Sequence, residues 1–223
     1  AAWATFNWLN SFVLFSPYFK IDKVDILLIG RVPLTAETVK NLFNIHRGRN
    51  IFDVDLNFTR DYALKAFPEV RTIIVNRVLP NKLVLTIRPR RPVAQVQLTS
   101  GFCLVDAEGI VLPSVRGLAA DDLPLISGID SRSIMAGVGK KYSASGFDKA
   151  LRLLEVINRM RFSRQHEIHT IDASDGENLS LYIEGGIEIK IGGGDFRNRL
   201  EMLDKTFEAG RFDRSQIRYI DLR

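Results

Sequence analysis

Cysteine and histidine are scarce in this chain of 223 residues, which has one cysteine and three histidines. Cys103 alone forms no internal disulfide and no thiolate zinc cluster, so the chain is not a disulfide-stabilised scaffold. His166 and His169 form an H-x-x-H pair at the start of a predicted strand, where residues i and i+3 point to opposite faces. The remaining histidine, His46, lies in a basic loop. We therefore expect no metal site.

Enzyme motifs are also missing. No serine stands in a G-x-S-x-G sequence, and neighbouring acids such as Asp53 and Asp55 fit turns and helix caps better than a catalytic dyad. The glycines at 192–194 lie between a predicted strand and a predicted helix, where anions can bind, but they match no nucleotide-binding motif. We expect a tight turn there with Asp195 as helix cap, in which replacing Gly193 and Gly194 with Ala changes stability and not ligand binding. The sequence thus predicts no enzyme, no cofactor and no small-molecule substrate.

The excess of positive charge is small, because 31 basic residues are spread among 26 acidic ones for a net charge of +5. One basic stretch, residues 75–96, places five bases among alternating apolar residues: Arg77, Lys82, Arg88, Arg90 and Arg91. It has no Phe or Tyr to stack on bases, as binders of single-stranded nucleic acid require. Its alternation predicts a β-hairpin followed by a proline-containing link between domains. Nucleic acid is therefore not an expected partner.

No run of apolar residues is long enough to span a bilayer, which needs about 20. The first fifteen residues nevertheless carry no charge and include five aromatics, and Lys20 is the first charged residue. Trp3 and Trp8 are typical of the interfacial end of a membrane helix. The alternative is an amphipathic helix packed on a soluble domain, because three residues form a polar stripe: Asn7, Asn10 and Ser11.

The segment after residue 16 predicts a βααββ order. The expected elements are a strand at 23–30, a helix within 33–43 capped by Thr35, a helix capped by Asn57 that ends before Pro68, and strands at 70–78 and 82–88. In the last strand, alternation puts three apolar side chains on one face: Leu83, Leu85 and Ile87.

Residues 93–223 predict a strand-rich region. Strands are expected at 93–98, 101–106, 109–113, 167–174, 178–184, 187–192 and 217–223. Amphipathic helices are expected at 145–160, with Ser145 and Asp148 as a capping box, and at 195–209. Residues 130–143 lack periodicity and predict a loop. The fold class is α+β: a βααββ domain, then a mostly antiparallel β-domain with helices on one side. The expected limits are a membrane-proximal segment at 1–19 and domains at 20–91 and 92–223.

The order of these segments resembles the FtsQ/DivIB family of bacterial cell-division proteins. The resemblance rests on seven pieces in sequence: "SPYFKIDKVDILLIG", "NIFDVDL", "FPEVRTIIVNRVLPNKLVLTI", "RRPVA", "LVDAEGIVL", "LPLISG" and "IRYIDLR". The pieces extend from about Ser16 to Arg223. Single pieces are weak, but the ordered series is specific.

The resemblance implies a POTRA domain at 20–91, a C-terminal β-domain, and a single membrane helix whose outer end includes Trp3 and Trp8. It implies a scaffold in the cell (inner) membrane, enriched at the division septum, with most of the chain in the periplasm or outside the cell. The implied partners are other divisome proteins, including the coiled-coil FtsB/FtsL pair. An alternative is a POTRA-bearing component of protein secretion or outer-membrane assembly, which would need repeated POTRA units.

The resemblance also points to an interaction site in the last segment. Its expected residues are Arg218, Tyr219, Ile220, Asp221, Leu222 and Arg223, with Arg223 pairing with an acid of the FtsB-like partner. Alternation puts Ile217 on one face with Tyr219 and Asp221, and Arg223 on the other. Two departures from the family pattern are Pro89, where a Glu often precedes "RRPVA", and the end of the chain at Arg223, beyond which the family has a last strand.

Overall fold

The computed structural model describes residues 12–30, 35–42, 47–209 and 217–223. The expectations for Trp3, Trp8, the polar stripe and His46 fall outside these ranges. The chain divides into two compact units between Arg90 and Arg91, here called the N-terminal unit and the C-terminal unit.

The N-terminal unit has the predicted βααββ order, preceded by a short 3-10 helix. Its elements are η1 (Pro17–Phe19), β1 (Lys23–Leu28), α2 (Ala36–Leu42), α3 (Leu56–Ala66), β2 (Val70–Val78) and β3 (Lys82–Pro89). The strands form one sheet in the order β1-β3-β2, in which β1 is parallel to β3 and β2 is antiparallel to it.

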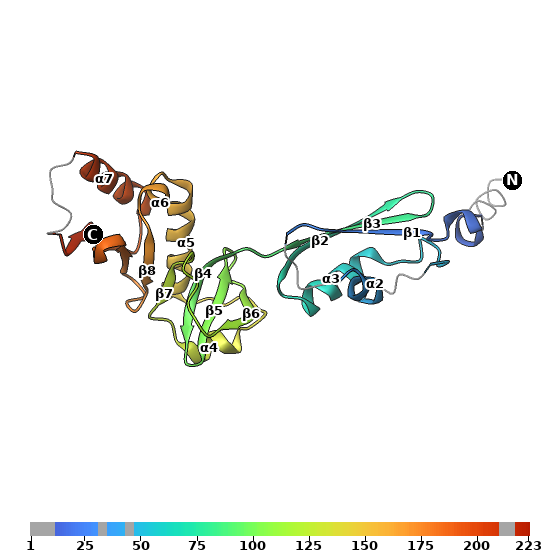
Figure 1. Ribbon diagram of the computed structural model, residues 1–223, viewed down its shortest axis with the longest axis horizontal. Coiled ribbons are helices and arrows are strands. Elements are labelled where there is room, and N and C mark those ends of the chain that lie inside the picture. Colours follow the sequence, from blue (N-terminus) through green and yellow to red (C-terminus); the bar gives the residue numbers. More distant parts are fainter. Residues whose placement is uncertain (1–11, 31–34, 43–46, 210–216) are drawn as a thin grey trace. The chain divides into compact units, whose positions relative to one another are not determined.

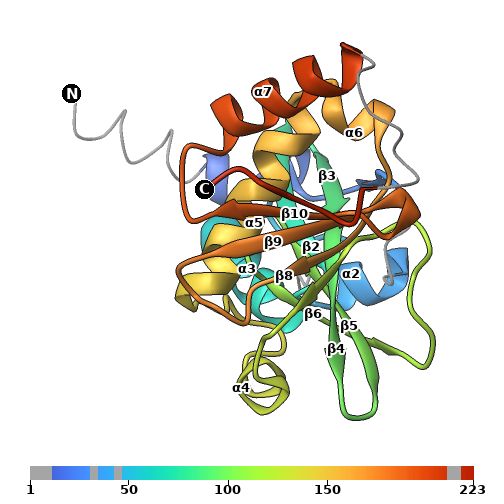
Figure 2. The same ribbon diagram turned by 90° about the vertical axis from the view of Figure 1, so that its left-hand side faces the viewer.

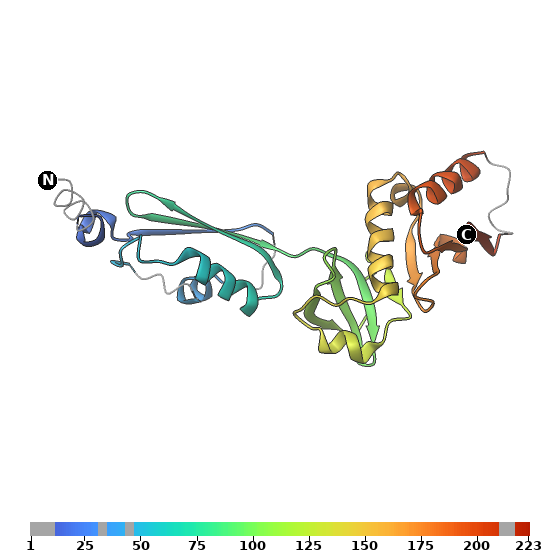
Figure 3. The same cartoon turned by 180° about the vertical axis from the view of Figure 1, so that it is seen from behind.

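The core of this unit lies between the sheet and its helices, which cover the same face in two opposite views (Figures 1 and 3). Leu83, Leu85 and Ile87 of the central strand are fully buried, as their alternation predicts. Val39 of α2 and Ala63 of α3 belong to the same apolar cluster. The hairpin prediction for residues 70–88 is therefore confirmed.

The caps of the two helices were only partly predictable. Thr35 accepts a hydrogen bond from the Thr38 amide at 3.1 Å, as expected. The prediction for Asn57 was wrong, because Asp55 is the N-cap of α3 and accepts from the amides of Asn57 and Phe58. Asp and Asn are equally good caps, and the tertiary position of the turn decides between them.

The C-terminal unit contains eight strands and four α-helices among the residues described. They are β4 (Pro92–Leu98), β5 (Gly101–Asp106), β6 (Val111–Arg116), β7 (Leu125–Ser127), α4 (Ser131–Ala136), α5 (Ser145–Arg159), α6 (Phe162–Gln165), β8 (Ile168–Asp172), β9 (Leu179–Ile183), β10 (Glu188–Gly192), α7 (Phe196–Glu208) and β11 (Tyr219–Asp221). A 3-10 turn, η2 (Glu184–Gly186), joins β9 to β10.

One sheet includes all eight strands in the order β11-β10-β9-β8-β7-β4-β5-β6. Figure 2 shows β8, β9 and β10 side by side. Four of its strand pairs are antiparallel, and the three parallel pairs are β4–β7, β7–β8 and β10–β11. The centre is narrow: β7 has three residues and meets β4 through two residue pairs, Gln95–Leu125 and Val96–Ile126.

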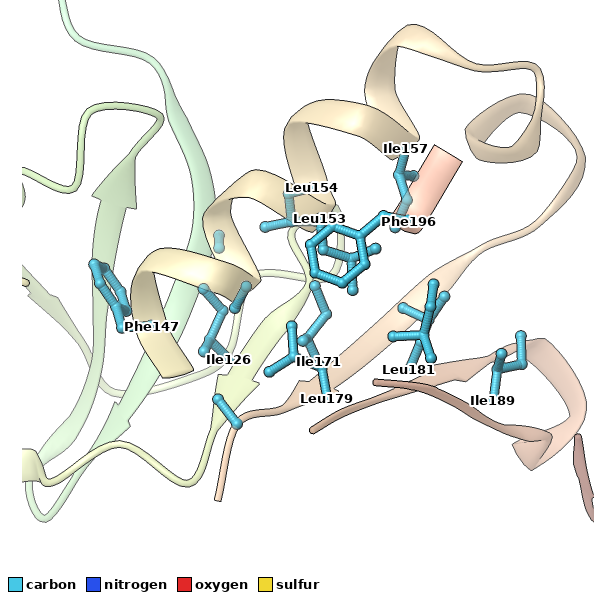
Figure 4. Close-up of a cluster of buried hydrophobic side chains, with 14 of the residues drawn as sticks. Ile126, Phe147, Leu153, Leu154, Ile157, Ile171, Leu179, Leu181, Ile189 and Phe196 are labelled. Atoms are coloured by element: carbon cyan, nitrogen blue, oxygen red, sulfur yellow. The ribbon is translucent and has the colours of Figure 1, made fainter. Parts of the chain in front are cut away.

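Helices α5 and α7 supply the apolar cover of this sheet. The α5 side chains of Phe147, Leu154 and Ile157 are buried in one cluster with strand residues, including Ile171 and Leu181 (Figure 4). From α7, the predicted stripe is buried in the same cluster: Phe196, Leu200, Leu203 and Phe207. The α+β class, with a largely antiparallel second domain, is confirmed.

Two local predictions in this unit were wrong. The segment 130–143 is not only loop, because α4 lies within it, with Asp130 accepting hydrogen bonds from the amides of Arg132 and Ser133. The capping box at Ser145 does not form: Ala144 is the N-cap of α5, and Asp148 instead accepts a bond from the Ser143 hydroxyl. Helix α4 has only six residues, of which Ile134 is buried, and it is too short to show a helical period in the sequence.

A candidate interaction edge in the C-terminal unit

Among the strands that the structure describes, β11 lies at one edge of the eight-stranded sheet. It pairs in parallel with β10, with Tyr219 opposite Glu188, Ile220 opposite Ile189, and Asp221 opposite Lys190. The predicted interaction residues therefore form or directly flank an edge strand. An edge strand exposes main-chain donors and acceptors that another strand can use.

The hydrogen bonds of β11 define which main-chain groups remain on its open side. The carbonyl of Arg218 accepts from the Glu188 amide at 3.0 Å, and the amide of Leu222 donates to the Lys190 carbonyl at 3.0 Å. In a parallel ladder, every second residue bonds to the same neighbour. The main-chain groups of Tyr219 and Asp221 consequently face away from β10, toward the open edge.

Side chains along this segment alternate between the core and solvent, but the residues on each face differ from the prediction. Ile217, Ile220 and Leu222 pack against the apolar core, whereas Tyr219 and Asp221 are exposed. Ile217 precedes the strand and does not follow its period. The prediction that Arg223 points away from Asp221 was wrong, because the two side chains lie on the same face, as residues two apart in extended chain do. The structure leaves Arg218 exposed.

Charge is concentrated beside the edge. The carboxylate of Asp221 accepts two hydrogen bonds from the guanidinium of Arg223 and one from the Arg223 amide. These bonds, with the positive charge of Arg223 and then of Lys190, hold the pKa of Asp221 far below its ordinary value. The same hydrogen bond and charge raise the pKa of Arg223. Lys190 also places its Nζ 5.0 Å from the centre of the Tyr219 ring.

The sheet face that carries these side chains continues onto β9, where sequence reasoning had indicated no site. Ser180 donates to the Glu188 carboxylate at 2.8 Å, and a hollow of about 220 Å³ is lined by Lys190, Arg223 and acids that include Asp172 and Asp175. Its lining mixes both signs of charge. In the sequence, polar residues alternate along 178–184 and 187–192 and could have indicated this face. Only the order of strands in the sheet shows which of these polar residues lie beside β11.

The glycine-rich turn has a structural explanation. Positive φ occurs at Gly192 and at Asp195, not at Gly193 and Gly194. A Cβ on Gly193 would lie 2.1 Å from the Glu177 carbonyl oxygen, and one on Gly192 would lie 3.2 Å from Cγ of Arg223. Asp195 stands at the N-cap but accepts from the Asn198 side chain rather than from a main-chain amide. Positive φ thus accounts for Gly192, and the close approach of the Glu177 carbonyl accounts for Gly193.

The two described histidines, His166 and His169, differ in their surroundings. His166 is buried, lies 2.8 Å from Glu184 through Nδ1 and contacts the rings of Phe162 and Phe207, whereas His169 is exposed. Within the described ranges, no group of three or more possible metal ligands exists.

In the hairpin, Arg77 donates to the carbonyls of Ile51 and Val54, and Lys82 forms an ion pair with Asp25. Three of the five bases in 75–96 therefore serve the fold of their own unit, since Arg90 also donates to the Pro68 carbonyl at 3.0 Å. Among the residues described, no helix is both long and apolar enough to cross a bilayer.

Comparison with known proteins gives concordant results for both units. Residues 94–223 match the family model of the cell-division protein FtsQ/DivIB C-terminal region, and residues 19–90 match the FtsQ-type POTRA domain. The chain is 30% identical to cell division protein FtsQ of Syntrophotalea carbinolica over 207 residues, 92% of this chain and 71% of that protein.

Two further relatives have the same name. Cell division protein FtsQ of Geotalea daltonii is 25% identical over 206 residues, 92% of this chain and 73% of that protein. That of Haemophilus influenzae is 28% identical over 231 residues, 96% of this chain and 83% of that protein. The POTRA match is of the FtsQ type, and nothing in these matches favours the alternative of a secretion or outer-membrane assembly component.

Proposed function

Because the chain belongs to the FtsQ/DivIB family of bacterial cell-division proteins, we propose that it is a non-enzymatic scaffold of the divisome. It is anchored by one membrane helix that includes the segment 1–15, and its two domains lie in the periplasm or outside the cell. It recruits and links other division proteins at the septum, among them an FtsB/FtsL-like coiled-coil pair. The proposed domains are 20–91 and 92–223, and the division of the chain into two compact units between Arg90 and Arg91 supports a boundary there.

The observation that carries the proposed recruitment is the open side of β11. Tyr219 and Asp221 direct their main-chain groups away from β10, so an incoming strand of the partner extends the eight-stranded sheet. Main-chain hydrogen bonds provide affinity in this mode, while neighbouring side chains provide selectivity. Around the edge, these side chains are Tyr219, Lys190 and Arg223.

The proposed role of Arg223 is to pair with an acidic residue of the FtsB-like partner. Arg223 already binds Asp221, and its side chain is about half exposed at 47%. An incoming carboxylate therefore has to share the guanidinium with Asp221 or displace it. A guanidinium has five N–H donors, of which Asp221 uses Nε and one Nη2 position, so sharing is geometrically feasible.

The test compares Tyr219→Pro with Tyr219→Ala. Both variants remove the ring, but only proline removes the outward-facing amide donor, and proline is tolerated on the open side of an edge strand. Binding of the cognate FtsB-like protein is measured by calorimetry. We expect Tyr219→Pro to bind about fivefold or more weakly than Tyr219→Ala, in line with the loss of roughly 1 kcal/mol for one hydrogen bond.

The thermal stability of both variants is the control. Equal affinity of two equally stable variants would exclude strand addition at β11. If Tyr219→Pro binds more weakly but also melts earlier, its melting temperature is compared with that of Leu222→Pro. Leu222→Pro removes a donor directed at β10 and should lower the stability much more.

A further inference from the structure

Five aromatic side chains, all but Phe19 exposed, gather at the place where the chain enters the N-terminal unit. We define the aromatic collar as Phe12, Phe15, Tyr18, Phe19 and Phe52. Edge-to-face contacts connect four of its rings, with centroids 6.0 Å apart for Phe12–Phe19, 5.3 Å for Tyr18–Phe19 and 5.4 Å for Phe19–Phe52. Phe15 is 79% exposed and Tyr18 is 62% exposed, values that are high for aromatic side chains in water.

Asn50 attaches the entering segment to the body of the unit. Its side-chain amide donates to the carbonyls of Val13 at 2.8 Å and Leu14 at 2.7 Å, which belong to the last helical turn before Ser16. Its Oδ1 accepts from the Phe52 amide at 2.8 Å. Asn50 is 7% exposed, and it thus caps the end of a helical turn 36 residues away along the chain.

The main chain strengthens this attachment. The Ile51 amide donates to the Phe19 carbonyl at 2.9 Å, and the Ile21 amide donates to the Arg49 carbonyl at 2.8 Å. Ile21 and Ile51 are fully buried in the core of the unit. Residues 12–21 are therefore part of the folded unit and not a loose tether.

The sequence before the collar determines which surface it meets. Residues 1–15 have no charge and contain Trp3, Phe6 and Trp8, a composition suited to the boundary between acyl chains and headgroups. From Phe15 to Phe19 the chain spans at most about 14 Å, even if fully extended. If residues 1–15 enter a bilayer, the collar therefore lies within the headgroup region or directly beside it.

From these contacts we infer that the aromatic collar docks the N-terminal unit against the headgroup region of the lipid bilayer, and that Asn50 fixes the orientation in which it docks. The inference rests on the membrane anchor of the proposed function. Aromatic rings prefer this interfacial layer, where the apolar body of the ring and a polar tip such as the Tyr18 hydroxyl are both satisfied. The domain then stands on the membrane in one pose rather than turning freely.

The test places an environment-sensitive fluorophore on the full chain at single engineered cysteines. Positions 15, 18 and 52 report on the collar, and position 118 in the C-terminal unit is the control, because Leu118 is 83% exposed and lies outside the collar. The native Cys103 is fully buried and stays unlabelled. Vesicles of phosphatidylethanolamine with a minority of phosphatidylglycerol are the probe.

We expect a blue shift of emission and quenching by brominated lipid at all three collar positions, and neither at position 118. A shift at position 15 without one at position 52 would overturn docking while leaving the membrane anchor intact. No shift at any position would overturn both. Equal shifts at positions 52 and 118 would show general adsorption and would likewise overturn a specific collar.

The role of Asn50 is tested separately with Asn50→Asp, which keeps the acceptor for the Phe52 amide but removes both donors to the helical turn. The expected result is that the shift at position 52 is lost while that at position 15 remains. Asn57→Ala, at an exposed asparagine of α3, is the matched control and should change neither. If Asn50→Asp melts earlier than the parent, Asn50→Ser provides the second variant; retention of the position 52 shift in both overturns the role of Asn50.

Discussion

The guanidinium of Arg223 donates two hydrogen bonds to the carboxylate of Asp221, with Nε 3.0 Å from Oδ1 and Nη2 2.7 Å from Oδ2. Both residues stand at the open edge of the sheet, so this intramolecular pair competes with any acidic group that a partner brings there. The competition gives opposite expectations for the two residues.

We expect Asp221→Asn to strengthen binding of an acidic partner strand, because it frees Arg223 and removes a negative charge. We expect Arg223→Glu to weaken it. Exposed ion pairs contribute little, so the gain in affinity for Asp221→Asn should be at most about fivefold, and charge reversal should cost more. Calorimetry at two salt concentrations checks both, since added salt should reduce each effect. Weaker binding by Asp221→Asn at unchanged stability would indicate that the intact pair, and not free Arg223, is what the partner recognises.

Asp221 should also titrate unusually. The hydrogen bonds and charge of Arg223 lower its pKa in the folded chain, whereas an unfolded Asp has a pKa of about 3.9. Because the folded pKa is the lower one, its contribution to stability is present above about pH 4 and is lost as the pH falls toward the folded pKa. Carbon-detected NMR of the carboxyl group should show Asp221 still ionised at about pH 3. In Arg223→Ala, which keeps the main-chain amide at 223 and Lys190, the pKa of Asp221 should move toward the ordinary value. An unchanged titration in that variant would exclude Arg223 as the cause.

The glycine-rich turn offers a matched pair of variants. In Gly193→Ala, the new methyl group would collide with the Glu177 carbonyl, so we expect a loss of about 1–3 kcal/mol in the free energy of unfolding. A Cβ on Gly194 has no neighbour within 4 Å, so Gly194→Ala should be close to neutral. Chemical denaturation measures both. Equal losses would mean that main-chain conformation, rather than the Glu177 contact, determines the need for glycine.

The basic hairpin residues can be separated by their contacts. Arg77 donates to two main-chain carbonyls and lies over the Phe52 ring at 5.8 Å, whereas Arg88 is exposed on the same hairpin. Arg77→Ala should lower the melting temperature of the N-terminal unit, with a cost of about 1 kcal/mol because the side chain is partly solvated. Arg88→Ala is the control and should change it little. A nucleic-acid complex weakened by both variants would contradict the structural role.

The two units should fold separately. We expect fragments 12–90 and 91–223 each to give a cooperative melting transition and dispersed NMR spectra. Fragment 20–90 should be less stable than 12–90, because it lacks Phe19, whose ring packs on the core and whose carbonyl binds Ile51. In a domain of this size, each 1 kcal/mol corresponds to about 4–8 °C in melting temperature. An unfolded 12–90 would place the boundary elsewhere.

Local patterns allowed much of the fold to be predicted. The alternation of Leu83, Leu85 and Ile87 and the stripe of Phe196 to Phe207 each reflect the period of one element, and both are buried as expected. Helix α4 and strand β7 were not predicted, because six or three residues are too few to show a period.

The site was predicted only as a segment. The sequence indicates that 218–223 is extended, but it does not show that β10 is its neighbour or that Lys190 reaches Tyr219. Likewise, Asn50 looks like an ordinary loop residue in the sequence. Its side chain donates to the main-chain carbonyls of Val13 and Leu14, and such acceptors have no sequence signature. Contacts between distant segments depend on the sheet order, which single-sequence patterns do not determine.

The narrow centre of the large sheet has a mechanical consequence. The C-terminal unit begins at β4, and the proposed partner binds at β11, so a load applied between these two strands is transmitted through the strand pairs from β4 to β11. The pairing of β4 with β7, through Gln95–Leu125 and Val96–Ile126 alone, is the shortest of these. Under such a load we expect this short pairing to yield first, which leaves the buried core, with Phe147 and Ile126, to hold the two parts of the sheet together.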